Sequence, residues 1–166
     1  MSAQVRPQIR DSRTLNYAER RTRLLLGRGL TQIATVVKRS TRFTVLVQLD
    51  RRAMATVTAK LSAKMLDLPA ELRKSLTWDR GMELAGHRDV TAVTGLSVYF
   101  ADPQSPWQRG TNENTNRLLR QYMPKGTSME HLTQEDLDRI ALKLNTRPRK
   151  TLDFDTPSDR LKPLLR

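Results

Sequence analysis

The spacing of apolar residues divides the first half of the chain into three β-like runs and a helix. Apolar and β-branched residues dominate residues 24–26, 32–38 and 42–49, and the short stretch between the last two runs is typical of an antiparallel hairpin. Apolar residues then recur at helical spacing from Met54 until Pro69 ends the pattern. We therefore expect three strands followed by a helix.

The second half of the chain alternates between strands and helices. Its four middle elements are expected at residues 75–78 (strand), 84–93 (helix), 96–100 (strand) and 113–122 (helix). A further helix should begin after Thr133, because Asp136 stands three residues later at the spacing of a capping box. This order predicts an α/β fold with a mixed five-stranded sheet flanked by helices.

Length and composition indicate one domain with basic ends. A chain of 166 residues is long enough for one core and too short for two. We expect a basic lead-in over residues 1–23, a folded core over residues 24–146, and a basic, irregular tail over residues 147–166 that holds three prolines. The chain has no 18-residue apolar run and no signal-peptide pattern, which predicts a soluble, cytoplasmic protein without a membrane partner.

The charge balance points to a polyanion as partner. The chain holds 30 Lys and Arg against 17 Asp and Glu, and the first 52 residues hold twelve of the former against three of the latter. Such an excess favours nucleic acid, contacted mainly through phosphates because aromatic residues are only 5% of the chain. The alternative is that the charge only keeps the protein soluble.

One acidic residue directly follows a predicted strand, and another lies at the start of a predicted helix. Asp79 follows the predicted strand at 75–78, and Glu113 lies in the first turn of a helix that Thr111 or Asn112 would cap. The chain has no cysteine and only two histidines, His87 and His131. Disulfides, zinc ribbons and thiol catalysis are thereby excluded, and any metal site should use carboxylates and a hard ion such as Mg²⁺ or Mn²⁺.

Three segments resemble a known family. They are TWDRGMELAGH at residues 77–87, VYFADPQSPWQRGTNENTNRLLRQYMPKGT at residues 98–127 and LNTRPRKTL at residues 144–152. Together they are similar to the DDE transposases of bacterial insertion sequences, in the insertion-sequence-thirty family. The resemblance extends over residues 27–157, and the 33 residues between Asp79 and Glu113 match the family's spacing of its second Asp and its Glu.

The resemblance implies a fold, a reaction and a site. It implies a ribonuclease H-like catalytic core that cuts DNA and joins strands, with a pair of Mg²⁺ or Mn²⁺ ions activating the nucleophile and holding the leaving group. Asp79 and Glu113 would be catalytic metal ligands. The partners would be insertion-sequence ends and target DNA, bound by a homo-oligomer. Candidate phosphate contacts are Arg109, Arg117, Arg120, Lys125, Arg147, Arg149 and Lys150.

The chain departs from the family at two points. The family's first Asp falls in register on Arg23, which cannot bind a cation, and the helix-turn-helix segments usual ahead of this core are missing. We therefore expect a truncated copy with impaired activity. The alternatives are a non-catalytic DNA-binding remnant that modulates an intact transposase, and a general ribonuclease H-type hydrolase.

Each candidate residue also has an ordinary structural interpretation. Asp79 could be a solvated turn residue, and Glu113 a charge favoured by the helix dipole. The basic residues could form a solvated face. Trp107 could pack its loop or touch DNA, Asp102 could serve the turn before Pro103, and His87 could be structural.

Overall fold

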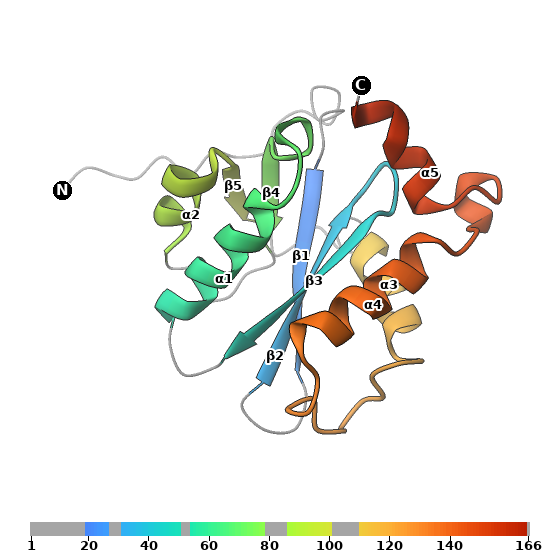
Figure 1. Ribbon diagram of the computed structural model, residues 1–166, viewed down its shortest axis with the longest axis horizontal. Coiled ribbons are helices and arrows are strands. Elements are labelled where there is room, and N and C mark those ends of the chain that lie inside the picture. Colours follow the sequence, from blue (N-terminus) through green and yellow to red (C-terminus); the bar gives the residue numbers. More distant parts are fainter. Residues whose placement is uncertain (1–18, 27–30, 51–53, 79–85, 101–109, 166) are drawn as a thin grey trace.

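A five-stranded mixed sheet forms the centre of the molecule. The computed structural model describes residues 19–26, 31–50, 54–78, 86–100 and 110–165 (Figure 1). The strands are β1 (Glu19–Leu26), β2 (Thr31–Lys38), β3 (Thr44–Asp50), β4 (Ser75–Trp78) and β5 (Ser97–Phe100). They lie in the order β3-β2-β1-β4-β5, which confirms the predicted mixed sheet of five strands.

The direction of each strand pair follows from the length of its connection. Strand β2 is antiparallel to both of its neighbours, β1 and β3, and a short turn joins β2 to β3. Strand β4 is parallel to β1 and to β5, with Thr22 opposite Trp78 and Trp78 opposite Phe100. Parallel neighbours need a crossover, and α1 (Met54–Leu66) and α2 (His87–Thr94) lie in those connections.

Helices cover both faces of the sheet. Side chains alternate between the faces, so neighbouring residues of β3 enter different cores: Val45 and Val47 pack with α1, and Leu46 packs on the other side. That second face is covered by α3 (Gly110–Leu119) and α4 (Gln134–Asn145). Figure 1 shows α1 and α2 on one side of the strands and α3 and α4 on the other.

The helical periodicity in the sequence accounts for how α1 and α4 form. In α1, Val57, Leu61 and Met65 recur every fourth residue and are all buried. Helix α4 begins with the predicted capping box, in which Thr133 accepts from the Asp136 backbone amide and the Asp136 carboxylate accepts from that of Thr133. The hydrogen bond from the Thr133 backbone amide lowers the pKa of the Asp136 carboxyl, and the Thr133 hydroxyl, which also donates to that carboxylate, lowers it further.

Helix α4 also covers the outer edge of β3. The Asn145 side chain accepts from the Thr44 backbone amide and donates to the Thr44 carbonyl, both at 2.8 Å. Three turns earlier, Gln134 accepts from the Gln48 amide at 2.9 Å and donates to the Leu46 carbonyl at 2.8 Å. Side-chain amides thereby replace a sixth strand, satisfying backbone groups that an edge strand otherwise leaves unpaired.

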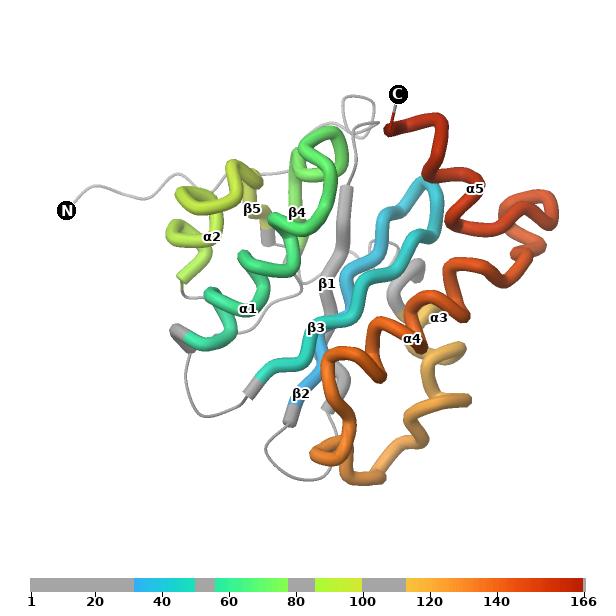
Figure 2. The backbone as a smooth tube through the Cα atoms, viewed as in Figure 1, coloured from blue at the N-terminus to red at the C-terminus, as the bar shows by residue number. Residues whose placement is uncertain are grey.

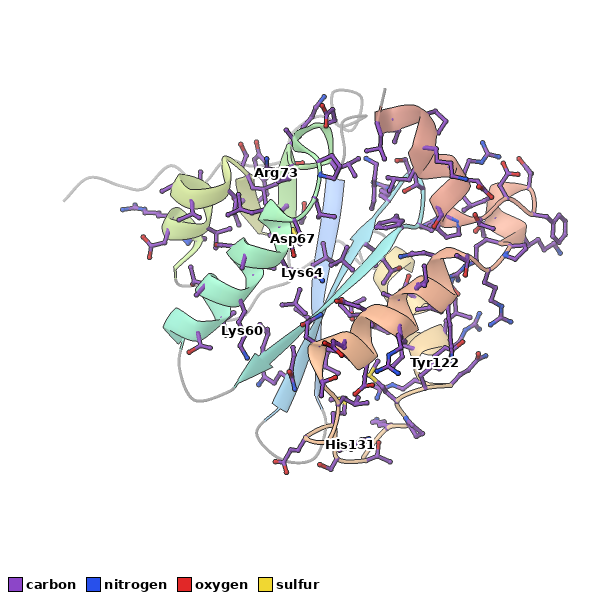
Figure 3. The ribbon with its side chains drawn as sticks, in the orientation of Figure 1. Lys60, Lys64, Asp67, Arg73, Tyr122 and His131 are labelled. Carbon is purple, nitrogen blue, oxygen red and sulfur yellow. The ribbon has the colours of Figure 1, made fainter. Side chains whose placement is uncertain are left out.

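An ion pair connects the two helical layers across the same edge. Lys64 of α1, which is labelled in Figure 3, donates to Asp138 of α4 at 2.9 Å. Both side chains are partly exposed, so the pair itself contributes only modestly to stability.

Four predicted elements differ from those observed. Strand β1 begins at Glu19 rather than at Leu24, because pairing with β2 and β4 extends it beyond its apolar run. Helix α2 begins at His87 rather than at residue 84, and ends at Gly95, which has the left-handed backbone typical of a helix end. The other two differences concern α3 and the C-terminal tail.

Helix α3 begins and ends three residues before its predicted bounds. It starts at Gly110, so neither Thr111 nor Asn112 is the residue that precedes it. It ends at Leu119 because the next turn tightens: the Tyr122 amide donates to the Leu119 carbonyl, three residues back, shortly before Pro124. Glu113 remains in the first turn, as predicted.

The C-terminal tail is ordered and was wrongly predicted to be irregular. It forms 3-10 helix η4 (Lys150–Leu152), α5 (Pro157–Leu161) and 3-10 helix η5 (Lys162–Leu165). The three prolines suggest irregular structure. Pro157, however, occupies the first turn of α5 after the Thr156 cap, where a backbone amide would have no partner within the helix. Leu152 and Leu161 are buried.

We predict that Asn145→Leu destabilises the fold by about 2–4 kcal/mol, because it leaves the buried amide and carbonyl of Thr44 without partners. Urea unfolding followed by circular dichroism measures the change. Thr146→Ala, at an exposed neighbouring position, is the control and should cost less than about 1 kcal/mol. Equal effects of the two substitutions would show that the amide pairing is not what holds the edge.

Candidate functional site

Two strands and one helix carry the positions that the sequence singles out. Strand β1 contains Arg23, which lies opposite Thr35 of β2. Strand β4 ends at Trp78, and Asp79 follows it in the sequence, outside the described residues. Glu113 is exposed in the first turn of α3.

Helix α3 packs directly over the strand that carries Arg23. It contacts β1 and β2, and its anchor is Leu119, which is fully buried with Ile33 of β2 and Leu137 of α4. Leu118 and Tyr122 pack against the same cluster, as the amphipathic pattern predicts. The fold therefore places the helix that carries Glu113 against the strand that carries Arg23. A single site that uses both positions requires this arrangement.

Two buried polar groups lie on this side of the sheet. Thr35 is on the same face as Ile33, two residues away, and its side chain is buried. Asn116, one turn after Glu113, is also buried. Neither the Thr35 hydroxyl oxygen nor the Asn116 carbonyl oxygen has a hydrogen-bond partner in the part of the chain that the structure describes.

The described residues do not provide a complete carboxylate site for a pair of metal ions. Among the described residues, no three His, Cys, Asp or Glu side chains are grouped so that they could hold a metal ion. On β1, position 23 carries a guanidinium, which is always charged and has no lone pair for a cation. His131 lies in the loop between α3 and α4, as Figure 3 shows, and His87 begins α2.

Several predicted site residues cannot be located. Asp79, Arg109 and Trp107 lie outside the described residues, as does Asp102. Glu113 is the one predicted metal ligand within them.

The predicted basic contacts fall into two described groups. Arg117, Arg120 and Lys125 lie on or just after α3, where Arg117 donates to Asn114 at 3.2 Å. Arg147, Arg149 and Lys150 follow α4. Arg147 connects the groups by donating to the side-chain oxygen Oε1 of Gln121 at 3.3 Å.

An aromatic side chain lies between the same two groups. The Lys143 ammonium lies 5.7 Å from the centre of the Tyr122 ring, within the range of a cation–π contact. Tyr122 is labelled in Figure 3 on the side of the molecule covered by α3 and α4.

Two further arginines, Arg39 and Arg42, lie between β2 and β3 and are not among the predicted phosphate contacts. Burial lowers the pKa of the Arg149 guanidinium, and the positive charges of Arg147 and Arg42 lower it further. Burial also lowers the pKa of the Arg42 guanidinium, and the positive charge of Arg39 lowers it further. Arg39 is exposed and Arg42 is partly exposed, so both add positive charge to the surface at the β2–β3 turn. The signal was available, because they flank a tight turn in the most basic part of the sequence.

In the described ranges, every helix is too short or too polar to cross a lipid bilayer.

Curated proteins similar to this chain are bacterial transposases. The chain is 57% identical over 136 residues to the transposase InsI for insertion sequence element IS30A of Escherichia coli (strain K12), covering 82% of this chain and 36% of that protein. It is 48% identical over 135 residues to the transposase for IS1086 of Cupriavidus metallidurans (81% and 40%) and 34% identical over 148 residues to that for IS4351 of Bacteroides fragilis (82% and 45%). The chain therefore spans less than half the length of these relatives. No family model matches it.

A solved structure has the same fold. The chain is similar to the catalytic core domain of BIV integrase, with a TM-score of 0.64, covering 88% of this chain and 94% of that one. The sequence identity of 14% means that this similarity concerns the fold alone. It confirms the predicted ribonuclease H-like fold.

We predict that Thr35→Val leaves stability unchanged or raises it by about 1 kcal/mol, because it removes a buried hydroxyl that has no partner among the described residues. Thermal unfolding measures the change, with Thr44→Val as the comparison. The Thr44 hydroxyl donates to the Arg42 carbonyl at 3.1 Å, so Thr44→Val should destabilise the fold. A clear loss of stability in Thr35→Val would reveal a polar partner for Thr35 between α3 and the sheet.

Proposed function

This chain is a homologue of the insertion-sequence transposases of the IS30 family, and we propose that it is a catalytic-core segment that binds insertion-sequence ends and target DNA. The observation that supports this proposal best is the packing of α3, with Glu113 in its first turn, against the strand that carries Arg23. The net charge of +13 supports DNA as the partner.

We propose further that its catalysis is impaired. Asp79 and Glu113 would supply two carboxylates, and Arg23 stands where the resemblance places the first. A fixed positive charge there repels a divalent cation instead of binding it. A Mg²⁺ or Mn²⁺ pair would therefore lack one of its expected ligands.

The second candidate function is that of a DNA-binding remnant which modulates an intact transposase. The arginine at position 23 favours this second function. A chain that folds and binds DNA without cutting it would occupy the element ends. Such a chain could also assemble with active copies, because processing two ends together requires more than one subunit. Homo-oligomerisation on DNA is part of this proposal.

A cleavage assay on DNA carrying the element ends tests the impaired site. We expect the unaltered chain to give no nicking or strand transfer above background with Mg²⁺ or Mn²⁺. Arg23→Asp should raise the rate about 100-fold or more, because a metal centre stabilises the transition state by several kcal/mol. Adding Asp79→Ala or Glu113→Gln to that variant should abolish the gain.

Two controls separate the role of the carboxylate from that of charge. Arg23→Ala removes the positive charge without adding a ligand, and Arg21→Asp makes the same charge change two residues earlier on β1. Both should stay inactive. Robust turnover by the unaltered chain, lost on Asp79→Ala, would contradict the proposal of impaired activity and leave the family assignment intact.

A further inference from the structure

The turn between β2 and β3 is held beside the segment that follows α4. The two hydrogen bonds between Asn145 and Thr44 fix these segments together at one point, two residues from Arg42 on one side and two from Arg147 on the other. Figure 2 shows the turn, in cyan, beside the red C-terminal part of the chain. The position of the arginines is therefore set by the fold.

Arg42 occupies a backbone conformation that arginine seldom adopts. Its φ is +62°, in the left-handed region where glycine or asparagine is favoured. Its amide donates to the Lys38 carbonyl at 2.7 Å, which closes the turn. A turn of this shape does not require an arginine. The arginine side chain at this position therefore indicates a role beyond forming the turn.

Three arginines belong to the two segments that meet at this junction: Arg42 precedes Thr44, and Arg147 and Arg149 follow Asn145. The Arg149 guanidinium donates to the Leu144 carbonyl at 3.3 Å; burial lowers its pKa, and the positive charges of Arg147 and Arg42 lower it further. The Arg149 Nε is buried and has no hydrogen-bond partner in the described part of the chain. The carboxylates of Asp153 and Asp155 pair with Arg160. Like charges close to one another repel, and a bound anion relieves that repulsion.

We infer that Arg42, Arg147 and Arg149 form a phosphate-binding site, the hairpin phosphate site, which takes backbone phosphates of duplex DNA. Guanidinium groups match phosphate oxygens with paired hydrogen bonds, and lysine does not. The site lies on the surface, is built from two segments and belongs to a chain of net charge +13, which suits a polyanion. Arg39, in the same turn, extends it.

The hairpin phosphate site would act together with the acidic position on α3. Arg147 donates to Gln121, which lies just after α3, and Glu113 lies about 9 Å before the last residue of that helix, Leu119. At 3.4 Å per base pair, that corresponds to about three base pairs. One duplex could therefore contact both places, with the arginines setting its position. This inference rests on the proposed function only in taking DNA as the partner.

DNA binding by the full chain tests the site without metal and without cleavage. Fluorescence anisotropy with a labelled duplex is measured from about 50 to about 200 mM salt, where phosphate contacts determine the slope. Arg42→Gly and Arg147→Gln should each weaken binding about tenfold, as expected for a lost charge-assisted hydrogen bond. Each should also reduce the slope of log affinity against log salt by about 0.9.

Matched variants keep this test specific. Arg139→Gln removes the same charge from an exposed arginine of α4 that pairs with Asp136, and should change neither affinity nor slope by as much. Arg42→Gly should also keep or raise the melting temperature, because glycine favours the left-handed backbone. Should Arg42→Gly fail to fold, Arg42→Asn and Arg147→Gln decide the question, since asparagine tolerates that conformation.

The outcomes separate the two proposals. Weaker binding and a lower slope in the Arg42 and Arg147 variants, with an unchanged Arg139 variant, support the hairpin phosphate site. Full affinity and an unchanged slope in those variants would overturn it and leave the proposed function standing. Failure of the unaltered chain to bind duplex DNA would overturn both.

Discussion

The pairing of side-chain amides on α4 with the backbone of β3 is the constraint on which the rest of the fold depends. Asn145 and Gln134 complete the hydrogen bonds of the outer strand, and they do so from a helix that also buries Leu137 and Leu144 against the sheet. Because the same core includes Leu119, the position of α4 determines that of α3. The placement of Glu113 over the first strand therefore depends on contacts made far from it.

Fold and chemistry have separate requirements in this molecule. The sheet order, the two cores and the packing of α3 need apolar residues at alternating and helical positions, and these are intact. Cation binding would need a carboxylate at position 23, and this requirement is independent of the core. An arginine there can change what the protein does while leaving its architecture in place, which is why similarity of fold alone does not establish activity.

The sequence predicts the elements whose signals are local. Strand β4 appears at its predicted residues, and α1 and the capping box of Thr133 follow directly from spacing. The extension of β1 depends on pairing with strands distant in the sequence, and the amide contacts of Asn145 join residues 101 positions apart, so neither leaves a local pattern. For the candidate site, the two acids and seven basic residues stay predictions from motif and charge, whereas Arg42 is singled out only by its backbone angle and its position beside the segment that follows α4.

The covered edge of β3 limits how copies of this protein can meet and how far the chain can be shortened. A second molecule cannot extend the sheet there, since the amides of α4 already occupy the hydrogen-bonding positions. Any pairing of sheets between two copies would therefore have to use the opposite margin of the sheet, beside β5. A chain that ended before α4 would leave the edge of β3 uncovered and prone to aggregation.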